Sequence, residues 1–227
     1  MKKFELVLTD TKVWCGITLY RIKACVEISR FGIKPGDLGG YVEKESNLDL
    51  SGNAWVSGNA WVYGDAQVYG NAWVYGDARV YGDAQVSGDV LVSGNAWVSG
   101  NAWVYGNARV YGDARVSGDV LVYGNAWVSG NAWVYGNARV YGDAQVYGNA
   151  RVYGKFHLLN LIGLRWSITV DSRKGVGFGC QHKSMKEWTV EEAKKNGLSE
   201  DLYKEYRKLV LQMKKIRKME MSSRGEW

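Results

Sequence analysis

Histidines and cysteines, the side chains with the widest chemical use, are few in this chain of 227 residues. The two histidines, His157 and His182, could each serve as a general base, but a metal centre with three imidazole ligands is excluded because the chain has only two. The three cysteines, Cys15, Cys25 and Cys180, are odd in number and lack metal-ligand spacing. They predict reduced thiols, and nothing in the sequence predicts a cofactor.

Carboxylates show a more regular arrangement. Seven aspartates occupy one position of a six-residue pattern and interchange there with asparagine: Asp65, Asp77, Asp83, Asp89, Asp113, Asp119 and Asp143. This interchange favours a role in backbone turns over acid–base catalysis. The sequence contains no nucleophile motif, phosphate-binding loop or redox pair. We therefore expect that the protein is not an enzyme.

The six-residue pattern fills residues 51–152 without interruption. Its seventeen units each read Ser or Tyr, Gly, Asn or Asp, Ala or Val, a variable residue, and Val. The fourth and sixth residues lie on one side of an extended segment, so they predict an inward column of small apolar side chains. The variable fifth residue points outward, and the glycine with its Asn or Asp favours a sharp corner. Each unit therefore predicts one short strand and one corner.

Corners every six residues around a narrow interior predict a triangular solenoid with three units per turn. The repeat resembles the hexapeptide-repeat left-handed parallel β-helix family, and the left-handed path is what that resemblance implies. Residues 45–50 read as a degraded first unit with Leu48 and Leu50 inward, which gives about six coils. We expect a mainly β fold: a small β N-terminal cap at residues 1–44, the β-helix at 45–158, and a C-terminal hairpin with helices at 159–227.

The flanking segments predict smaller elements. Residues 12–14 and 17–28 read as a hairpin, and residues 165–171 and 176–181 read as two more strands. Two helices are expected, one ending at Gly197 and one from Glu200 to Met221, with capping pairs Ser184/Glu187 and Thr189/Glu192 before them. The second helix carries an apolar stripe formed by Leu202, Tyr206, Leu209, Met213 and Ile216.

Net charge is uneven along the chain, with +1 in residues 1–50, −2 in the repeats and +7 in residues 153–227. The basic C-terminal helix offers a contact for nucleic acid, but a solvated helix face explains such a run more simply. The longest apolar stretch is a handful of residues near Leu158 to Leu164, far short of the roughly 20 residues that a spanning helix needs, and residues 1–10 lack a signal peptide's apolar centre. We therefore expect a soluble cytoplasmic protein with no membrane partner.

The outward column divides over three faces when the residues are placed eighteen to a coil. The first face alternates Trp61, Arg79, Trp97, Arg115, Trp133 and Arg151; the second has Trp55, Trp73, Leu91, Arg109, Trp127 and Gln145; the third starts at Asp49 and continues with Gln67, Gln85, Trp103, Leu121, Arg139 and His157. The candidate binding residues are the whole first face with Trp55, Trp73 and Trp127. Two interpretations stay open: a ladder of guanidinium groups stacked on indoles, or an interface for proteins or bases. Residues 87–116 recur almost unchanged as 117–146, so duplication contributes to the alternation.

Segments outside the repeats carry a second resemblance. Residues 19–24 (LYRIKA) and 36–48 (GDLGGYVEKESNL), which lead directly into the repeats, and the later Gly179-Cys180-Gln181 and Glu187-Trp188 resemble hexapeptide-repeat proteins of bacteriophages and prophages. That group has no established activity to transfer. The resemblance implies a viral protein in the host bacterial cytoplasm.

These observations favour a non-catalytic binding or scaffold protein that self-associates, with a homotrimer favoured, or captures a host component. One alternative is an acyltransferase relative, because many hexapeptide-repeat proteins transfer acyl groups with a histidine base and a protruding loop, although the seventeen units contain neither. Another is a counter-defence protein that sequesters a nucleotide-like ligand or inhibits a host defence protein.

Overall fold

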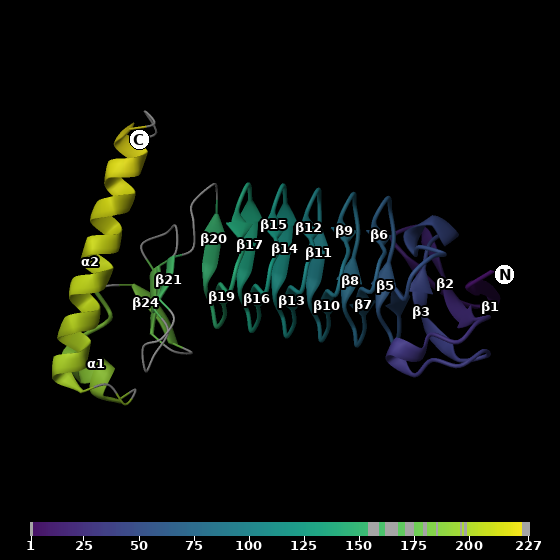
Figure 1. The fold of residues 1–227 in the computed structure, drawn as a ribbon, viewed down its shortest axis with the longest axis horizontal. Helices are drawn as coiled ribbons and strands as arrows, with labels where there is room; N and C mark the ends of the chain where they lie inside the picture. The colour runs from purple at the N-terminus through teal and green to yellow at the C-terminus, as the bar shows by residue number, and fades with distance from the viewer. Residues whose placement is uncertain are drawn as a thin grey trace. The chain divides into compact units, whose positions relative to one another are not determined.

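The computed structural model describes residues 2–153, 159–161, 168–170, 175–178, 181–184, 186–195, 197 and 199–223. The chain forms two compact units, Met1–His157 and Leu158–Trp227. Most of the first unit is a parallel β-solenoid of about six turns, whose coils lie side by side between the N-terminal segment and β20 (Figure 1). The mainly β, solenoidal fold class is confirmed.

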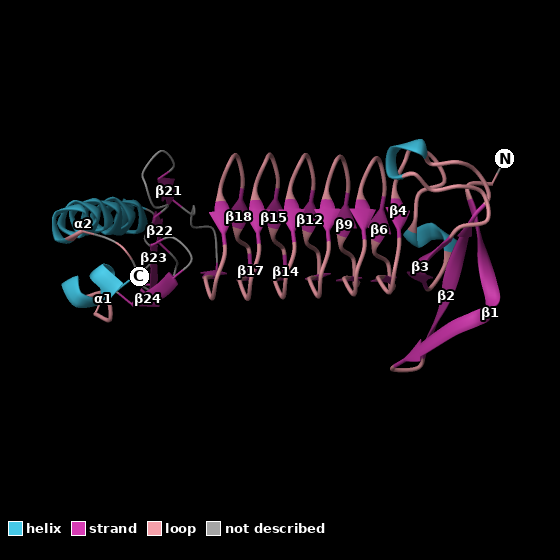
Figure 2. Ribbon diagram, turned by 90° about the horizontal axis from the view of Figure 1, so that it is seen from below, coloured by secondary structure: helices cyan, strands magenta, loops and turns pink. Residues whose placement is uncertain are grey.

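Two-residue to four-residue strands form the three faces of the solenoid (Figure 2). The first face holds β5 (Trp61–Val62), β8 (Arg79–Val80), β11 (Trp97–Ser99), β14 (Arg115–Gly118), β17 (Trp133–Gly136) and β20 (Arg151–Tyr153). The second holds β4 (Trp55–Val56), β7 (Trp73–Val74), β10 (Leu91–Val92), β13 (Arg109–Val110), β16 (Trp127–Val128) and β19 (Gln145–Val146). The third holds β6 (Gln67–Val68), β9 (Gln85–Val86), β12 (Trp103–Val104), β15 (Leu121–Val122) and β18 (Arg139–Val140).

On each face, every described strand but the last pairs in parallel with the strand eighteen residues further along, so equivalent positions of successive coils lie opposite one another. Trp97 is opposite Arg115, for example, and Val98 is opposite Val116. The backbone N–H of Trp97 donates to the carbonyl oxygen of Ala114 at 2.9 Å, and this bond recurs along the solenoid. The coil length predicted from the repeat is therefore correct.

The inward columns of valine and alanine form the core of the solenoid. From Ala54 to Val152, the residues at the fourth and sixth positions of the units are at most 8% exposed. Leu48 is also buried, as expected, and bridges to Val68. The inward position expected for Leu50 is wrong, because this side chain is 53% exposed. The carboxylate of Asp49 accepts bonds from the backbone and hydroxyl of Ser51, and this local turn takes Leu50 away from the interior.

The N-terminal segment extends the first face and closes one end of the solenoid. It contains β1 (Phe4–Trp14), β2 (Ile17–Ala24), β3 (Leu38–Val42) and two short 3₁₀ turns, η1 (Ser29–Phe31) and η2 (Glu45–Asn47). Strand β3 lies parallel to β5, and β2 and β1 follow as antiparallel strands. The expected hairpin is present, but its first strand starts at Phe4. We call residues 2–47 the N-terminal cap.

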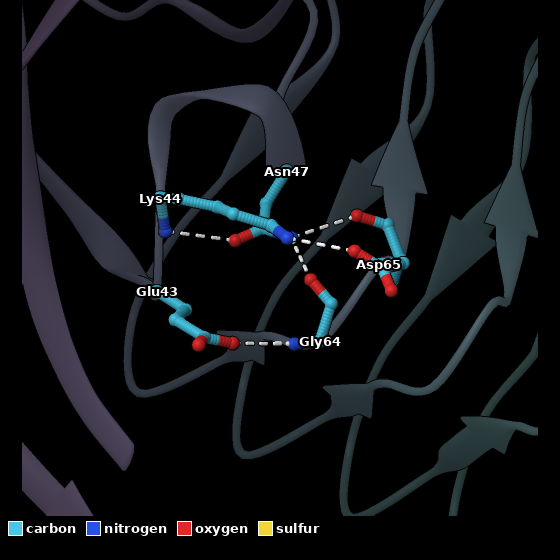
Figure 3. Close-up of polar contacts among 6 residues, drawn as sticks. Glu43, Lys44, Asn47, Gly64 and Asp65 are labelled. Atoms are coloured by element: carbon cyan, nitrogen blue, oxygen red, sulfur yellow. Dashed lines mark hydrogen bonds and ion pairs between the residues drawn. The ribbon is translucent and has the colours of Figure 1, made fainter.

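Polar side chains of the cap satisfy the backbone of the first coil on the third face (Figure 3). The amide nitrogen of Asn47 donates to the carbonyl oxygens of Gly64 and Ala66 at 3.0 and 2.9 Å. The Glu43 carboxylate accepts the N–H of Gly64 at 2.6 Å, and the Lys44 ammonium donates to Asp65 at 2.7 Å. These groups replace the bonds that a preceding coil would make, so the end of the solenoid is not left as a free strand edge.

In the second unit, four short strands form an antiparallel sheet in chain order: β21 (Leu159–Leu161), β22 (Ile168–Val170), β23 (Gly175–Phe178) and β24 (Gln181–Ser184). Helix α1 (Val190–Lys195) and helix α2 (Glu200–Ser223) follow. Thr189 caps α1 by accepting the N–H of Glu192 at 3.1 Å, as predicted. Ser184 instead ends β24. No helix in the described residues is long and apolar enough to cross a membrane.

The apolar face of α2 differs from the expected stripe by about one residue. Tyr203, Tyr206 and Val210 are buried, whereas Leu202 is only partly covered. Tyr203 also hydrogen-bonds to the carbonyl oxygen of the buried Trp188. The side chains of Leu209, Met213 and Ile216 lie outside the described residues. Tyr206 is thus buried as predicted, whereas the structure buries Tyr203 in place of Leu202, because a tyrosine can bury its ring while its hydroxyl finds a partner.

We predict that alanine at a corner glycine destabilises the solenoid most where the next coil is close. At Gly100 (φ +68°) an added Cβ would lie 2.8 Å from the nitrogen of Gly118, whereas at Gly142 (φ +63°) it would meet no described atom within 4 Å. Both Gly100→Ala and Gly142→Ala carry the left-handed strain of about 1–2 kcal/mol. Gly100→Ala should cost roughly a further 1–3 kcal/mol from overpacking. Urea unfolding followed by circular dichroism measures the difference; equal losses would contradict the close stacking.

A second prediction concerns Lys3, which is only 3% exposed and donates to the carbonyl oxygens of Asp49 and Ser51 at 2.9 and 3.4 Å. Burial lowers the pKa of its ammonium from 10.5 to about 8, against the opposing attraction of Asp49. Between these values the unfolded chain holds a proton that the folded chain has lost, so stability rises with pH.

The wild type should therefore gain up to about 3 kcal/mol over Lys3→Met as the pH rises from 8 to 10.5. The measurement is chemical unfolding of both proteins across that range. Using the difference between the two proteins removes the titration of tyrosines and other lysines. Parallel stability curves would contradict the burial of a charged Lys3.

Candidate functional site

The outward residues of the first face form a ladder of arginines stacked between tryptophans. The guanidinium of Arg115 lies 4.7 Å from the ring centre of Trp97 and 5.0 Å from that of Trp133. Arg79 lies in the same way between Trp61 and Trp97, at 4.4 and 5.4 Å, and Arg151 is 4.8 Å from Trp133. Each cation therefore faces an indole on a neighbouring coil. The stacked ladder, one of the two interpretations left open by the sequence, is present.

The N-terminal cap continues this ladder and covers its first rungs. Tyr41 lies opposite Trp61 in the adjacent strand, and the ammonium of Lys12 lies 4.3 and 5.6 Å from these two ring centres. At the end of β1, Trp14 packs edge-on against Trp61 at 5.8 Å, and Arg79 lies 5.1 Å from the Trp14 ring. Trp61 and Arg79 thus take part in attaching the cap to the solenoid.

The cap also covers the start of the second face. Trp55 is fully buried at 0% exposure in β4, the end strand of its sheet, and Phe31 stacks on Trp73 with ring centres 4.8 Å apart. The indole N–H of Trp73 donates to the hydroxyl of Ser57 at 2.8 Å. The expectation that Trp55 is an accessible binding residue is therefore wrong. Its side chain points out of the coil, but the non-repetitive segment packs over that end of the face.

On the described faces of the solenoid, three tryptophans remain substantially exposed, one on each face. Trp103 is 47% exposed, and Trp127 and Trp133 are each 37% exposed. Tyr111 packs edge-on against Trp127 at 6.3 Å, and Arg109 lies 5.1 Å from the same indole. Trp127 and Trp133 are among the binding residues predicted from the sequence, but Trp103 is not. The sequence could have predicted that Trp103 is exposed. Its neighbours in the outward column are Gln85 and Leu121, and neither of these side chains can stack a cation on the indole.

Asparagine and aspartate side chains form hydrogen-bonded ladders along the corners. In each bond the amide nitrogen of an asparagine donates to the side-chain oxygen of the residue eighteen positions later. The pairs are Asn53–Asn71, Asn71–Asp89, Asn95–Asp113, Asn101–Asp119, Asn107–Asn125, Asn125–Asp143 and Asn131–Asn149, at 2.8–3.3 Å. The interchange of Asp and Asn predicted a role in the backbone turns. These side chains also link successive coils by hydrogen bonds.

Each aspartate interrupts its ladder, because an ionised carboxylate accepts hydrogen bonds but cannot donate one to the next coil. At two such interruptions the cap supplies a cation. Lys44 pairs with Asp65 at 2.7 Å, and Arg30 pairs with Asp89 at 2.9 Å. Lys44 holds the pKa of the Asp65 carboxyl below its usual value. The carboxylates at the corners are therefore places where an added donor or cation completes the ladder.

The residues with classical catalytic chemistry do not gather at these surfaces in the described chain. Cys15 is exposed and Cys25 is partly buried, and both are free thiols. His157 and Cys180 lie outside the described residues, and for His182 only the backbone, in β24, is described. Among the residues that the structure describes, no three His, Cys, Asp or Glu side chains are placed to hold a metal ion.

We predict that the ladder contributes measurably to stability. Arg115→Gln removes two contacts with indoles, each of about 0.5–1 kcal/mol, so the free energy of unfolding should fall by roughly 1–2 kcal/mol. The matched control is Arg139→Gln on the third face, where none of the described rings stacks on the guanidinium; it should change stability by less than about 0.5 kcal/mol. Urea unfolding compares them. Equal effects would show that stacking is not the source of the stability.

Comparison with protein families gives one result that agrees with this geometry. The model of the YdcK beta solenoid repeat matches residues 66–82, 74–88, 84–100, 102–118, 114–130, 132–146 and 144–159. No match was found among curated proteins. The matched segments run through the stacked coils described above. The chain is therefore a repeat β-solenoid protein, and its repeats between residues 66 and 159 are similar to those that this model describes.

Proposed function

We propose that the chain is a non-catalytic binding or scaffold protein that uses the exposed outer faces of its solenoid to hold other polypeptides. The observation that carries this proposal is the contrast between the two halves of the solenoid. The cap covers Trp55 and packs on Trp61 and Trp73, whereas Trp127 and Trp133 stay 37% exposed beyond its reach. Exposed aromatic clusters of this kind favour a protein contact.

The stacked ladder makes this surface suitable for binding. Arg115 and Arg151 already hold Trp133 from both sides, at 5.0 and 4.8 Å. Side chains held in this way lose less conformational entropy when a partner arrives than free rotamers would. The valine and alanine core likewise keeps the faces flat and rigid. Rigid aromatic and arginine side chains are the residues that dominate the energy of protein interfaces.

The partner that we propose first is another copy of the chain, with a homotrimer as the favoured assembly. Trp127 and Trp133 stand on neighbouring faces of the solenoid, separated by the corner that contains Ser129, which is 8% exposed. A partner seated over this small corner could contact both indoles. Rotational symmetry would then bury the same patch on every copy, as closed cyclic assemblies require.

The cellular setting belongs to the same proposal. Residues 19–24 and 36–48 support an origin in a bacteriophage or prophage, and such a protein would act in the host bacterial cytoplasm. There the same tryptophan surface could capture a host component instead of another copy. Acyl transfer from acetyl-coenzyme A by the purified chain would contradict the non-catalytic part of the proposal.

The test is the mass of the protein in solution. The wild type should sediment as an oligomer of the 25.4 kDa chain, with a trimer expected. The double variant Trp127→Ala, Trp133→Ala should keep its circular dichroism spectrum and dissociate at least about tenfold more readily. The matched control, Arg139→Ala with Gln67→Ala, changes two exposed residues of the third face and should assemble normally. A monomeric wild type, or equal dissociation of both variants, would contradict self-association through this surface.

A further inference from the structure

The cap docks on the second face through an arginine and the phenylalanine that follows it. Phe31 stacks on Trp73 with ring centres 4.8 Å apart and an angle of 27° between the rings. The adjacent Arg30 donates to Asp89 at 2.9 Å, and Asp89 also accepts the amide of Asn71 at 2.9 Å. The docking site thus combines an indole face with a carboxylate at an interruption of the corner ladder.

The same set of residues occurs a second time, thirty positions later, on a different face. Asn71, Trp73, Asp89, Leu91, Asn107 and Arg109 correspond to Asn101, Trp103, Asp119, Leu121, Asn137 and Arg139. In both sets the tryptophan lies opposite the leucine, and the leucine lies opposite the arginine. In both, the first asparagine donates to the aspartate, at 2.9 and 2.8 Å. Because thirty is not a multiple of eighteen, the second set lies on the third face.

No described segment of the chain covers the second set. Its six residues line a surface groove of about 370 Å³. Trp103 is 47% exposed, and no cation in the described residues pairs with Asp119. Asp119 cannot donate to Asn137 on the next coil, so the corner ladder is interrupted here as it is at Asp89. The groove therefore lacks the partners that Arg30 and Phe31 provide on the second face.

We propose that this groove binds a segment of another polypeptide in which an arginine is followed directly by an aromatic residue. The aromatic ring would stack on Trp103, over a floor formed by Leu121. The guanidinium would donate to the Asp119 carboxylate, a charge-assisted bond that is stronger than a neutral one. Arg139 at the far end adds a positive charge, which disfavours a second cation there and fixes the direction of the segment.

A second copy of this chain is not the occupant, because its own arginine and phenylalanine are held in place. The backbones of Ile28 and Ile33 bond to each other at 2.9 and 3.3 Å around the turn that carries them. Ile28 is only 2% exposed, so its side chain anchors the turn to its own chain. Exchange between copies would break these contacts and the stack on Trp73.

This inference rests on the proposed binding function, and it names the chemistry of one partner. It uses Trp103, whereas the assembly proposed above uses Trp127 and Trp133. Variants in the groove leave that second surface intact, so failure of the groove and failure of self-association are distinguishable by measuring both on the same proteins.

The test uses a fluorescein-labelled peptide with the sequence of residues 27–34, EISRFGIK, titrated with the full-length chain and followed by fluorescence anisotropy. We expect weak binding, with a Kd on the order of 0.1 mM, because a short free peptide loses its freedom on binding. Peptides with Arg30→Gln or Phe31→Ala should bind at least about tenfold more weakly.

Protein variants locate the site. Trp103→Ala and Asp119→Asn should each weaken the peptide by about tenfold or more. The matched controls are Trp14→Ala and Asp113→Asn, since Trp14 is 43% exposed outside both proposed surfaces and Asp113 accepts an asparagine amide at 2.9 Å much as Asp119 does. The controls should change the Kd by less than about twofold. Because all four positions face solvent, the folds should persist, and circular dichroism verifies this.

Three results would overturn the proposal. The first is equal binding of the wild-type peptide and the peptides that lack the arginine or the ring. The second is a loss in the control variants as large as that in the groove variants. The third is a wild type that dimerises and a variant, Arg30→Gln or Trp103→Ala, that does not. A second copy of the chain would then be what binds in the groove.

Discussion

The in-register stacking of coils, one above the next every eighteen residues, is the constraint on which the rest of this structure depends. Hydrogen bonds such as Trp97 N–H to the carbonyl of Ala114 hold each coil to its neighbour, and the valine columns fill a narrow interior. No unit could bury enough surface alone, so the stability is shared along the solenoid. Because equivalent positions coincide, any side chain on the outside meets its counterparts above and below.

This alignment of successive coils gives a simple repeat three outer faces with different side chains. The alternation of tryptophan and arginine on the first face becomes a stacked ladder only because Trp97, Arg115 and Trp133 are consecutive in one column. Asparagine at the corners becomes a hydrogen-bonded ladder for the same reason. A shift of thirty residues places the same pattern on another face, and the residues on which the cap docks at Trp73 recur in this way at Trp103. Growth of the repeat thus supplies new surfaces without a change of fold.

The solenoid could be predicted almost completely from the sequence, because the same residue types recur at the inward and outward positions of seventeen units. The order of residues on each face followed from counting by eighteen. The contacts of the N-terminal cap could not be predicted, because its sequence has no repeat from which the position of each side chain could be counted. Nothing in the residues around Trp55 shows that the cap covers it, and nothing in the repeat shows that Phe31 reaches Trp73. The exposed Leu50 has a local cause, the turn at Asp49, which competes with the pattern at the edge of the repeat.

The register of the coils can be measured directly by cysteine cross-linking in a chain whose Cys15, Cys25 and Cys180 are replaced by serine. Gln67 and Gln85 lie opposite each other on the third face, at a strand spacing of about 4.8 Å that suits a disulfide. Gln67→Cys with Gln85→Cys should form an intramolecular disulfide under mild oxidation. Arg79→Cys with Gln85→Cys, closer in sequence but on different faces, should stay reduced. The opposite result, or equal oxidation of both pairs, would contradict the eighteen-residue register.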